Sequence, residues 1–114
     1  MFRGSFRGGG GGGGGGGTVS IVSITSADSP YNLPTSETAL LVDSTAGLVT
    51  VNLPTPSLAT GVLYYVKNTA GADVNRVRVL VSTGRIDDET YIDLDNDFSA
   101  VTLVSDGTNY YIIS

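Results

Sequence analysis

Apolar and polar residues alternate along much of this chain with the two-residue period of β-strands. In the run 48–53, Val49, Val51 and Leu53 fall on one face, and the run 76–81 repeats the pattern with three valines. A helical period of 3.6 residues is not sustained in any segment long enough to predict a helix. The predicted strands are 19–25, 39–43, 48–53, 63–67, 76–81, 91–94, 101–104 and 110–113.

Turn and breaker residues separate these runs. Pro30 and Pro34 break the strand pattern after the first predicted strand, because proline has no backbone N–H to donate to a neighbouring strand. Asp106-Gly107 between the last two strands is a hairpin signal. About eight short strands at this spacing predict an all-β fold, a small antiparallel β-sandwich or barrel.

Two predicted strands are apolar on both faces. The runs 63–66 and 110–113 carry large side chains at every position, although one face of a small antiparallel sandwich is normally solvated. Either these are central strands partly covered by loops, or their second face packs on a neighbouring subunit, where tyrosine is favoured. The second reading makes Tyr64, Tyr65, Tyr110 and Tyr111 candidate oligomer-interface residues.

The first seventeen residues differ from the rest and divide the chain into an arm, 1–17, and an all-β module, 18–114. The arm contains Phe2-Arg3-Gly4, then Phe6-Arg7, and ends in ten consecutive glycines at 8–17. Polyglycine has no side chains to build a core and behaves as a flexible coil in water. We therefore expect an extended anchoring arm.

The arm's side chains suggest how it binds. Phe2 and Phe6 would fill apolar pockets of a partner protein, while Arg3 and Arg7 would bind its carboxylates. Two alternatives stay open, a flexible tail without a partner and a bundle in which three glycine arms wrap around one another.

Charge and composition exclude several classes of function. The net charge is −5, and all eleven acidic residues lie in the module, which argues against binding to nucleic acid phosphates. The chain has no cysteine and no histidine, so disulfides, the usual zinc sites and imidazole triads are excluded. No apolar run approaches the ~18 residues of a membrane span. We expect no membrane, nucleic acid, cofactor or metal partner.

Six of the acidic residues cluster at 87–97. Asp93, Asp95 and Asp97 resemble the opening of a calcium loop, but Phe98 stands where such a loop needs glycine. A solvated acidic loop is the preferred interpretation. The run 87–89 contains the carboxylates that a glycosidase needs, but the chain has no tryptophan and little room for a sugar cleft. We therefore expect a protein that is not an enzyme.

Three segments carry a resemblance to a known family. They are LVDSTAG at 41–47 with VTVNLP at 49–54, GVLYYVKN at 61–68, and VTLVSDGTNYYII at 101–113. Together they resemble a small β module of tailed-bacteriophage virion proteins, found in tail fibres, spikes and head fibres, and the resemblance covers 19–114. It implies a structural, usually trimeric, virion protein without catalytic or cofactor residues. One departure is Ile86-Asp87-Asp88, where the family pattern has Ile-Asp-Gly in a tight turn, so the conformation of this loop stays open.

The resemblance and the short length together favour a capsid decoration (cement) protein, located on the virion. It would form a homotrimer and dock on the major capsid protein, or another virion protein, through its arm. The alternative is a short tail fibre, spike or tail-tip component that contacts host surface polysaccharide through Tyr31, Tyr91 and Tyr110.

Overall fold

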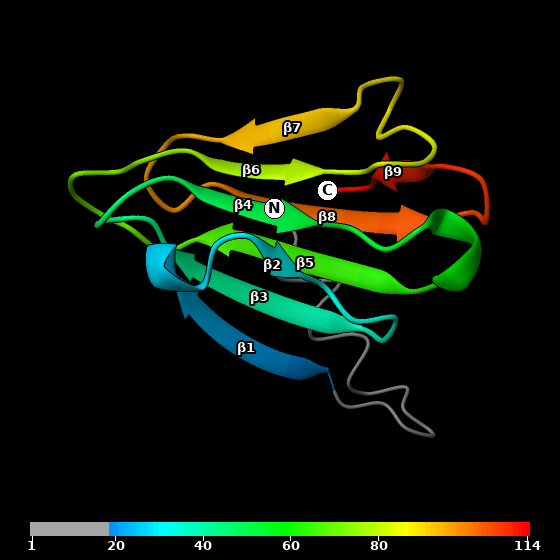
Figure 1. The fold of residues 1–114 in the computed structure, drawn as a ribbon, viewed down its shortest axis with the longest axis horizontal. Helices are drawn as coiled ribbons and strands as arrows, with labels where there is room; N and C mark the ends of the chain where they lie inside the picture. The colour runs from blue at the N-terminus through cyan, green and yellow to red at the C-terminus, as the bar shows by residue number, and fades with distance from the viewer. Residues whose placement is uncertain (1–18) are drawn as a thin grey trace.

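The computed structural model describes residues 19–114, which form two β-sheets packed face to face (Figure 1). Sheet A has the strand order β1-β3-β5-β8-β9, and sheet B has the order β2-β4-β6-β7. The strands are β1 (Ser20–Thr25), β2 (Tyr31–Asn32), β3 (Thr38–Asp43), β4 (Val49–Asn52), β5 (Leu63–Asn68), β6 (Val77–Leu80), β7 (Tyr91–Leu94), β8 (Ala100–Ser105) and β9 (Tyr110–Ile112). Two short 3₁₀ helices, η2 (Ser26–Asp28) and η3 (Pro56–Leu58), lie in the connections.

The first six strands wind between the sheets. Each complete winding of the chain adds one strand to sheet A and the following strand to sheet B. Successive strands of one sheet therefore run in the same direction, so β1, β3 and β5 pair in parallel, as do β2, β4 and β6. This path is that of a short β-solenoid. The last three strands do not continue this winding, because β7, β8 and β9 each pair antiparallel to a neighbouring strand.

The all-β prediction is confirmed, but the prediction of an antiparallel sandwich is wrong for the first six strands. Four of the seven strand pairings in the described residues are parallel. Consecutive strands change sheet instead of turning back on one another, so their spacing does not mark hairpins. Within residues 19–114 the edge strands β1, β9, β2 and β7 do not join the two sheets into a closed barrel, and β9 is bridged only at Tyr110, by Ile86.

All eight predicted strands are present, and each bound lies within one residue of its predicted position. The sequence analysis missed β2, which has two residues and lies between Pro30 and Pro34. It also missed both 3₁₀ helices, which are too short to show a period. The predicted hairpin at Asp106-Gly107 is confirmed by the antiparallel pairing of β8 with β9.

The core lies between the sheets and is built from alternate residues of each strand. Val49 and Val51 of β4 and Val77 and Val79 of β6 face inward, as their spacing predicts, and all four are buried.

Two tyrosines cross this core. Tyr64 and Tyr110 are both 0% exposed, and their ring centroids are 6.2 Å apart. Each hydroxyl donates a hydrogen bond to a proline carbonyl, Tyr64 to Pro34 and Tyr110 to Pro54. The polar end of each buried ring is thereby satisfied.

A buried amide closes one end of the core. Asn68, at the end of β5, donates from Nδ2 to the carbonyl oxygens of Asn75 (3.0 Å) and Leu94 (3.1 Å). Its Oδ1 accepts from the Ser44 hydroxyl (2.9 Å) and from the Ala70 backbone N–H (3.2 Å). One side chain thus joins the turn after β3 to the ends of β5 and β7 and to the segment that leads into β6.

Candidate interaction surface

The outer face of sheet A carries apolar residues on all five strands, together with the polar residues Ser23, Lys67 and Thr102. Because side chains alternate along a strand, Leu63 and Tyr65 of β5 point outward when Tyr64 and Val66 point into the core. We call this surface the apolar face. It consists of Ile21, Ala39, Leu41, Leu63, Tyr65, Val104, Tyr111 and Ile113.

Strand register assembles the apolar face into continuous rows. Ala39 and Tyr65 are paired across β3 and β5, and Ile21 extends this row to the edge strand β1. Leu63, Val104 and Tyr111 are paired across β5, β8 and β9 in a second row. Residues far apart in the sequence therefore form one surface.

Exposure is greatest at the two edges of the apolar face. Ile21 on β1 is 64% exposed, while Tyr111 on β9 and the adjoining Ile113 are 41% and 54% exposed. Tyr65, near the centre, is buried, and its hydroxyl donates to the Glu37 carboxylate at 3.1 Å. The exposed apolar side chains of this face therefore lie at its two opposite edges, on either side of a buried centre.

The outer face of sheet B has the opposite character. Arg78 of β6 binds Asp93 of β7 through two hydrogen bonds, Nε to Oδ1 at 2.8 Å and Nη2 to Oδ2 at 3.0 Å. The guanidinium also lies 3.8 Å from the ring centroid of Tyr91. The hydrogen bond from Arg78 holds the pKa of Asp93 below its usual value. Thr50 and Asn52 of β4 complete a polar surface suited to water.

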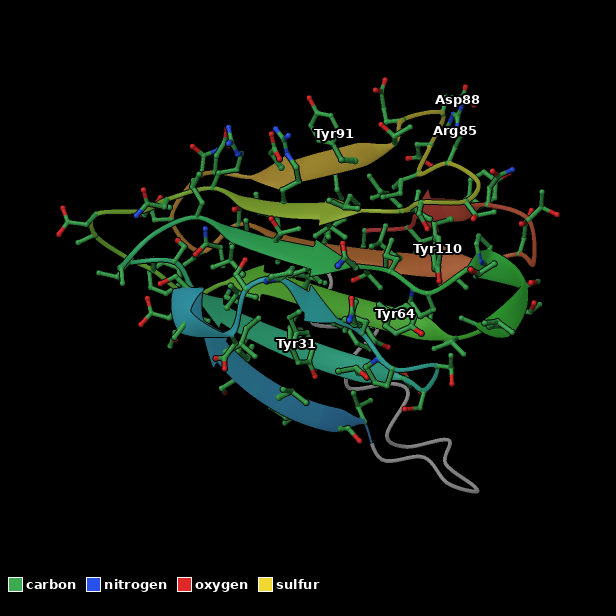
Figure 2. The ribbon with its side chains drawn as sticks, in the orientation of Figure 1. Tyr31, Tyr64, Arg85, Asp88, Tyr91 and Tyr110 are labelled. Atoms are coloured by element: carbon green, nitrogen blue, oxygen red, sulfur yellow. The ribbon has the colours of Figure 1, made fainter. Side chains whose placement is uncertain are left out.

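The structure corrects the predicted interface tyrosines. The prediction is wrong for Tyr64 and Tyr110, because both are fully buried in the core of a single chain (Figure 2). Tyr65 lies on the apolar face but is buried. Tyr111 is the one of the four that exposes a large part of its ring. The same face also includes four residues that the prediction did not name, Ile21, Leu63, Val104 and Ile113. The alternation of side chains along each strand is the sequence signal that could have identified them.

The three tyrosines predicted to contact polysaccharide differ in their exposure. Tyr110 is buried and Tyr31 packs partly against the core, so the prediction is wrong for Tyr110. Tyr91 is 42% exposed and projects from β7 (Figure 2). The predicted partner-binding residues Phe2, Arg3, Phe6 and Arg7 lie outside the described residues.

The acidic stretch 87–97 does not gather its carboxylates around one point. Asp93 is engaged by Arg78, and residues 19–114 contain no group of three or more carboxylates placed to hold a metal ion. Asp87 and Asp88 occupy a tight turn, with φ angles of +46° and +73°. The segment 86–89, whose conformation the sequence did not predict, therefore forms a tight turn without a glycine.

Over the same part of the chain, no helix has the length and apolar character needed to cross a membrane. Comparison with models of known protein families gave no match, and comparison with curated protein sequences gave none either. The features of residues 19–114 that bear on function are therefore the apolar face of sheet A and the contrasting polar face of sheet B.

Proposed function

We propose that this protein is a non-enzymatic structural component of a bacteriophage virion, a capsid decoration protein. It associates with copies of itself, as a homotrimer, through the apolar face, and docks on the major capsid protein through residues 1–17. The observation that carries this proposal is the apolar face itself, and the sequence resemblance supplies the virion context.

Leaving the exposed side chains of the apolar face in water costs free energy. Each buried Å² of apolar surface contributes about 25 cal/mol, so covering Ile21, Tyr111 and Ile113 favours association. Charged side chains stand at one end of this face, with Lys67 near the end of β5 and Asp43 at the end of β3. An apolar centre with a charged margin is the usual anatomy of a protein interface.

The alternative function, a short fibre or tail-tip component that contacts host polysaccharide, has a separate observation in its favour. Tyr91 is exposed on the polar face, which self-association through sheet A leaves free. The number of copies per virion separates the two functions. Quantitative mass spectrometry against the major capsid protein should find a copy number comparable to that of the capsomers for a decoration protein. A handful of copies would support the fibre or tail tip.

Removing the arm tests the docking role. Deletion of residues 1–17 should leave the module folded, because the described core uses none of these residues, and should abolish co-sedimentation with particles that lack the protein. A variant with Arg3→Ala and Arg7→Ala keeps the arm's length and should bind more weakly than the full chain. Equal co-sedimentation of the deleted and full chains would remove the arm from the mechanism.

A further inference from the structure

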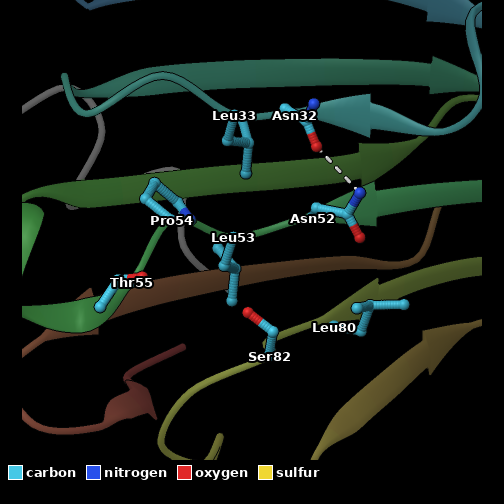
Figure 3. A pocket seen from close by; sticks show the side chains of 8 residues that line it. All are labelled: Asn32, Leu33, Asn52, Leu53, Pro54, Thr55, Leu80 and Ser82. Atoms are coloured by element: carbon cyan, nitrogen blue, oxygen red, sulfur yellow. Dashed lines mark hydrogen bonds between the residues drawn. The ribbon is translucent and has the colours of Figure 1, made fainter.

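A groove of about 440 Å³ runs across the outer side of sheet B, where β2, β4 and β6 end (Figure 3). Its lining carries no charged residue and consists of Asn32, Leu33, Asn52, Leu53, Pro54, Thr55, Leu80 and Ser82. The groove thus combines amides and hydroxyls with the partly exposed side chains of Pro54 and Leu80, whereas the side chains of Leu33 and Leu53 belong to the core. It lies on the molecule's polar side, away from the apolar face.

The strand ladder fixes the position of these side chains. Asn32 is paired with Asn52, Asn52 with Leu80, and Leu80 with Tyr91, so the four lie in one row across sheet B. Beyond the strand ends, Leu33 N–H donates to the Asn52 carbonyl and Leu53 N–H to the Leu80 carbonyl, both at 2.9 Å. The floor of the groove, where Leu33 and Leu53 are buried, is therefore built on continuous backbone pairing.

Several polar atoms in the groove are free to bind a ligand. Asn52 Nδ2 donates to Asn32 Oδ1 at 2.9 Å, which fixes the orientation of both amides. That leaves Asn32 Nδ2 as a donor and Asn52 Oδ1 as an acceptor, and Figure 3 shows the Asn52 oxygen turned away from Asn32. The hydroxyls of Thr55 and Ser82 add two groups that both donate and accept.

Tyr91 supplies a fixed aromatic ring next to Leu80. One face of the ring is covered by the Arg78 guanidinium, and Asp93 holds that guanidinium through two hydrogen bonds. The ring is still 42% exposed. It therefore extends the row of amide and aliphatic groups with a rigid flat surface.

From this arrangement we propose that the groove binds a neutral saccharide. A sugar ring presents hydroxyls that donate and accept hydrogen bonds together with apolar C–H surfaces, and the groove offers a match for each. The lining carries no charge, and the Arg78 guanidinium beside Tyr91 is already paired with Asp93. A neutral saccharide is therefore favoured over an anionic one, because a carboxylate there would lose water without gaining an unpaired cation. This inference stands whether or not the protein is part of a virion.

Nuclear magnetic resonance on the ¹⁵N-labelled full chain tests the proposal. The probes are neutral trisaccharides (maltotriose, cellotriose, mannotriose and chitotriose) with trigalacturonate as an anionic comparison. At least one neutral probe should give saturable amide shifts confined to residues 32–33, 52–55, 80–82 and Tyr91. Trigalacturonate should give weaker shifts at the same residues.

Two variants and a matched control sharpen the test. Asn52→Ala and Ser82→Ala each remove a polar group from the groove, and loss of one good hydrogen bond should weaken binding by about tenfold. Thr50→Ala changes the same strand and face outside the groove and should bind like the unmodified chain. Circular dichroism confirms that each variant is folded.

Three results would overturn the inference. The first is the lack of a saturable shift at the groove with any neutral probe at tens of millimolar. The second is binding of Asn52→Ala and Ser82→Ala with unchanged affinity while both remain folded. The third is tighter binding of trigalacturonate than of every neutral probe, which would contradict the chemical class.

Discussion

At the scale of single residues, the turn at residues 86–89 shows how the fold accepts a poor turn sequence. Asp87 and Asp88 both have positive φ, the pattern of a type I′ turn, in which the second central residue is usually glycine. Ile86 N–H donates to the Glu89 carbonyl at 2.6 Å, and Glu89 N–H returns the bond at 2.8 Å. Asp87 N–H also donates to the Tyr110 carbonyl, which ties the turn to β9.

Glycine at position 88 should therefore stabilise the protein. Positive φ is sterically unfavourable for a residue with a Cβ, and glycine lacks this penalty. Asp88→Gly should therefore raise the free energy of unfolding by about 0.5–1 kcal/mol. Asp95→Gly is the control, because Asp95 is exposed and does not have positive φ. Glycine there only adds freedom to the unfolded chain, so this substitution should leave the stability unchanged or lower it. Urea denaturation measures both. A lower stability for Asp88→Gly would show that the Asp88 side chain itself supports the turn.

The buried tyrosines predict an alkaline limit to stability. Burial raises the pKa of Tyr64 to about 12, and burial with the hydrogen bond to Glu37 raises the pKa of Tyr65 to about 12. Burial also raises the pKa of Tyr110. The folded state thus disfavours ionisation of these residues, whereas the unfolded chain ionises them near pH 10.

The sign of the pH dependence follows from linkage. Stability contributed by the neutral tyrosines is fully present below pH 10 and is lost as the pH rises from 10 toward 12. The urea concentration at the midpoint of unfolding, measured between pH 8 and 11.5, should decrease as the pH rises above 10. Tyr64→Phe should make this decrease less steep. Titration of all six tyrosines near pH 10, with the native circular dichroism spectrum intact, would contradict this account.

At the scale of secondary structure, strand positions follow from sequence but strand partners do not. The two-residue period marks β4 and β6 clearly because their valines alternate with polar residues. The same period serves parallel and antiparallel pairing, so it does not reveal that the chain winds between two sheets. A clue was present in the doubly apolar runs, which are typical of strands covered on both faces.

The same limit explains the errors in the interface prediction. In β5, Tyr64 and Tyr65 are adjacent and chemically identical, so the sequence does not say which one faces the core. In β9, Tyr110 and Tyr111 present the same problem. Cross-strand register decides it, because Tyr64 is paired with the core residue Leu103 and Tyr111 with Val104 on the outer face. Register is a property of the folded sheet and is not visible in one strand.

Asn68 is the residue through which several elements depend on one another. Asn68→Ala leaves the Ser44 hydroxyl and the carbonyls of Asn75 and Leu94 without this partner, so we expect a loss of about 2–4 kcal/mol. Asn96→Ala is the matched control, because Asn96 is exposed and should change stability by less than about 0.5 kcal/mol. Chemical denaturation measures both variants. Equal stability of the two would show that the elements are held by apolar packing alone.

At the scale of the whole molecule, the outer faces of the two sheets differ in chemical character. The apolar face of sheet A is suited to a permanent protein contact, whereas sheet B offers water a polar surface with a groove. The proposed assembly through sheet A would leave the groove open in every copy. The open edges at β1 and β2 lie at the start of the winding path.

A matched pair of tyrosines separates the two faces. Tyr111 and Tyr91 are 41% and 42% exposed, on the outer faces of sheets A and B respectively. Tyr111→Asp places a charge on the apolar face and should dissociate the oligomer, because a buried unpaired carboxylate is costly. Tyr91→Asp adds the same charge to the polar face and should leave association unchanged. Circular dichroism checks that both variants retain their fold.

Sedimentation equilibrium of the full chain and these two variants is the most direct test of the apolar face as an assembly surface. The account predicts a molar mass about three times the 11.7 kDa of one chain for the unmodified protein and Tyr91→Asp, and a monomer for Tyr111→Asp. A monomeric unmodified protein at all concentrations, or a folded Tyr111→Asp that still associates fully, would contradict it.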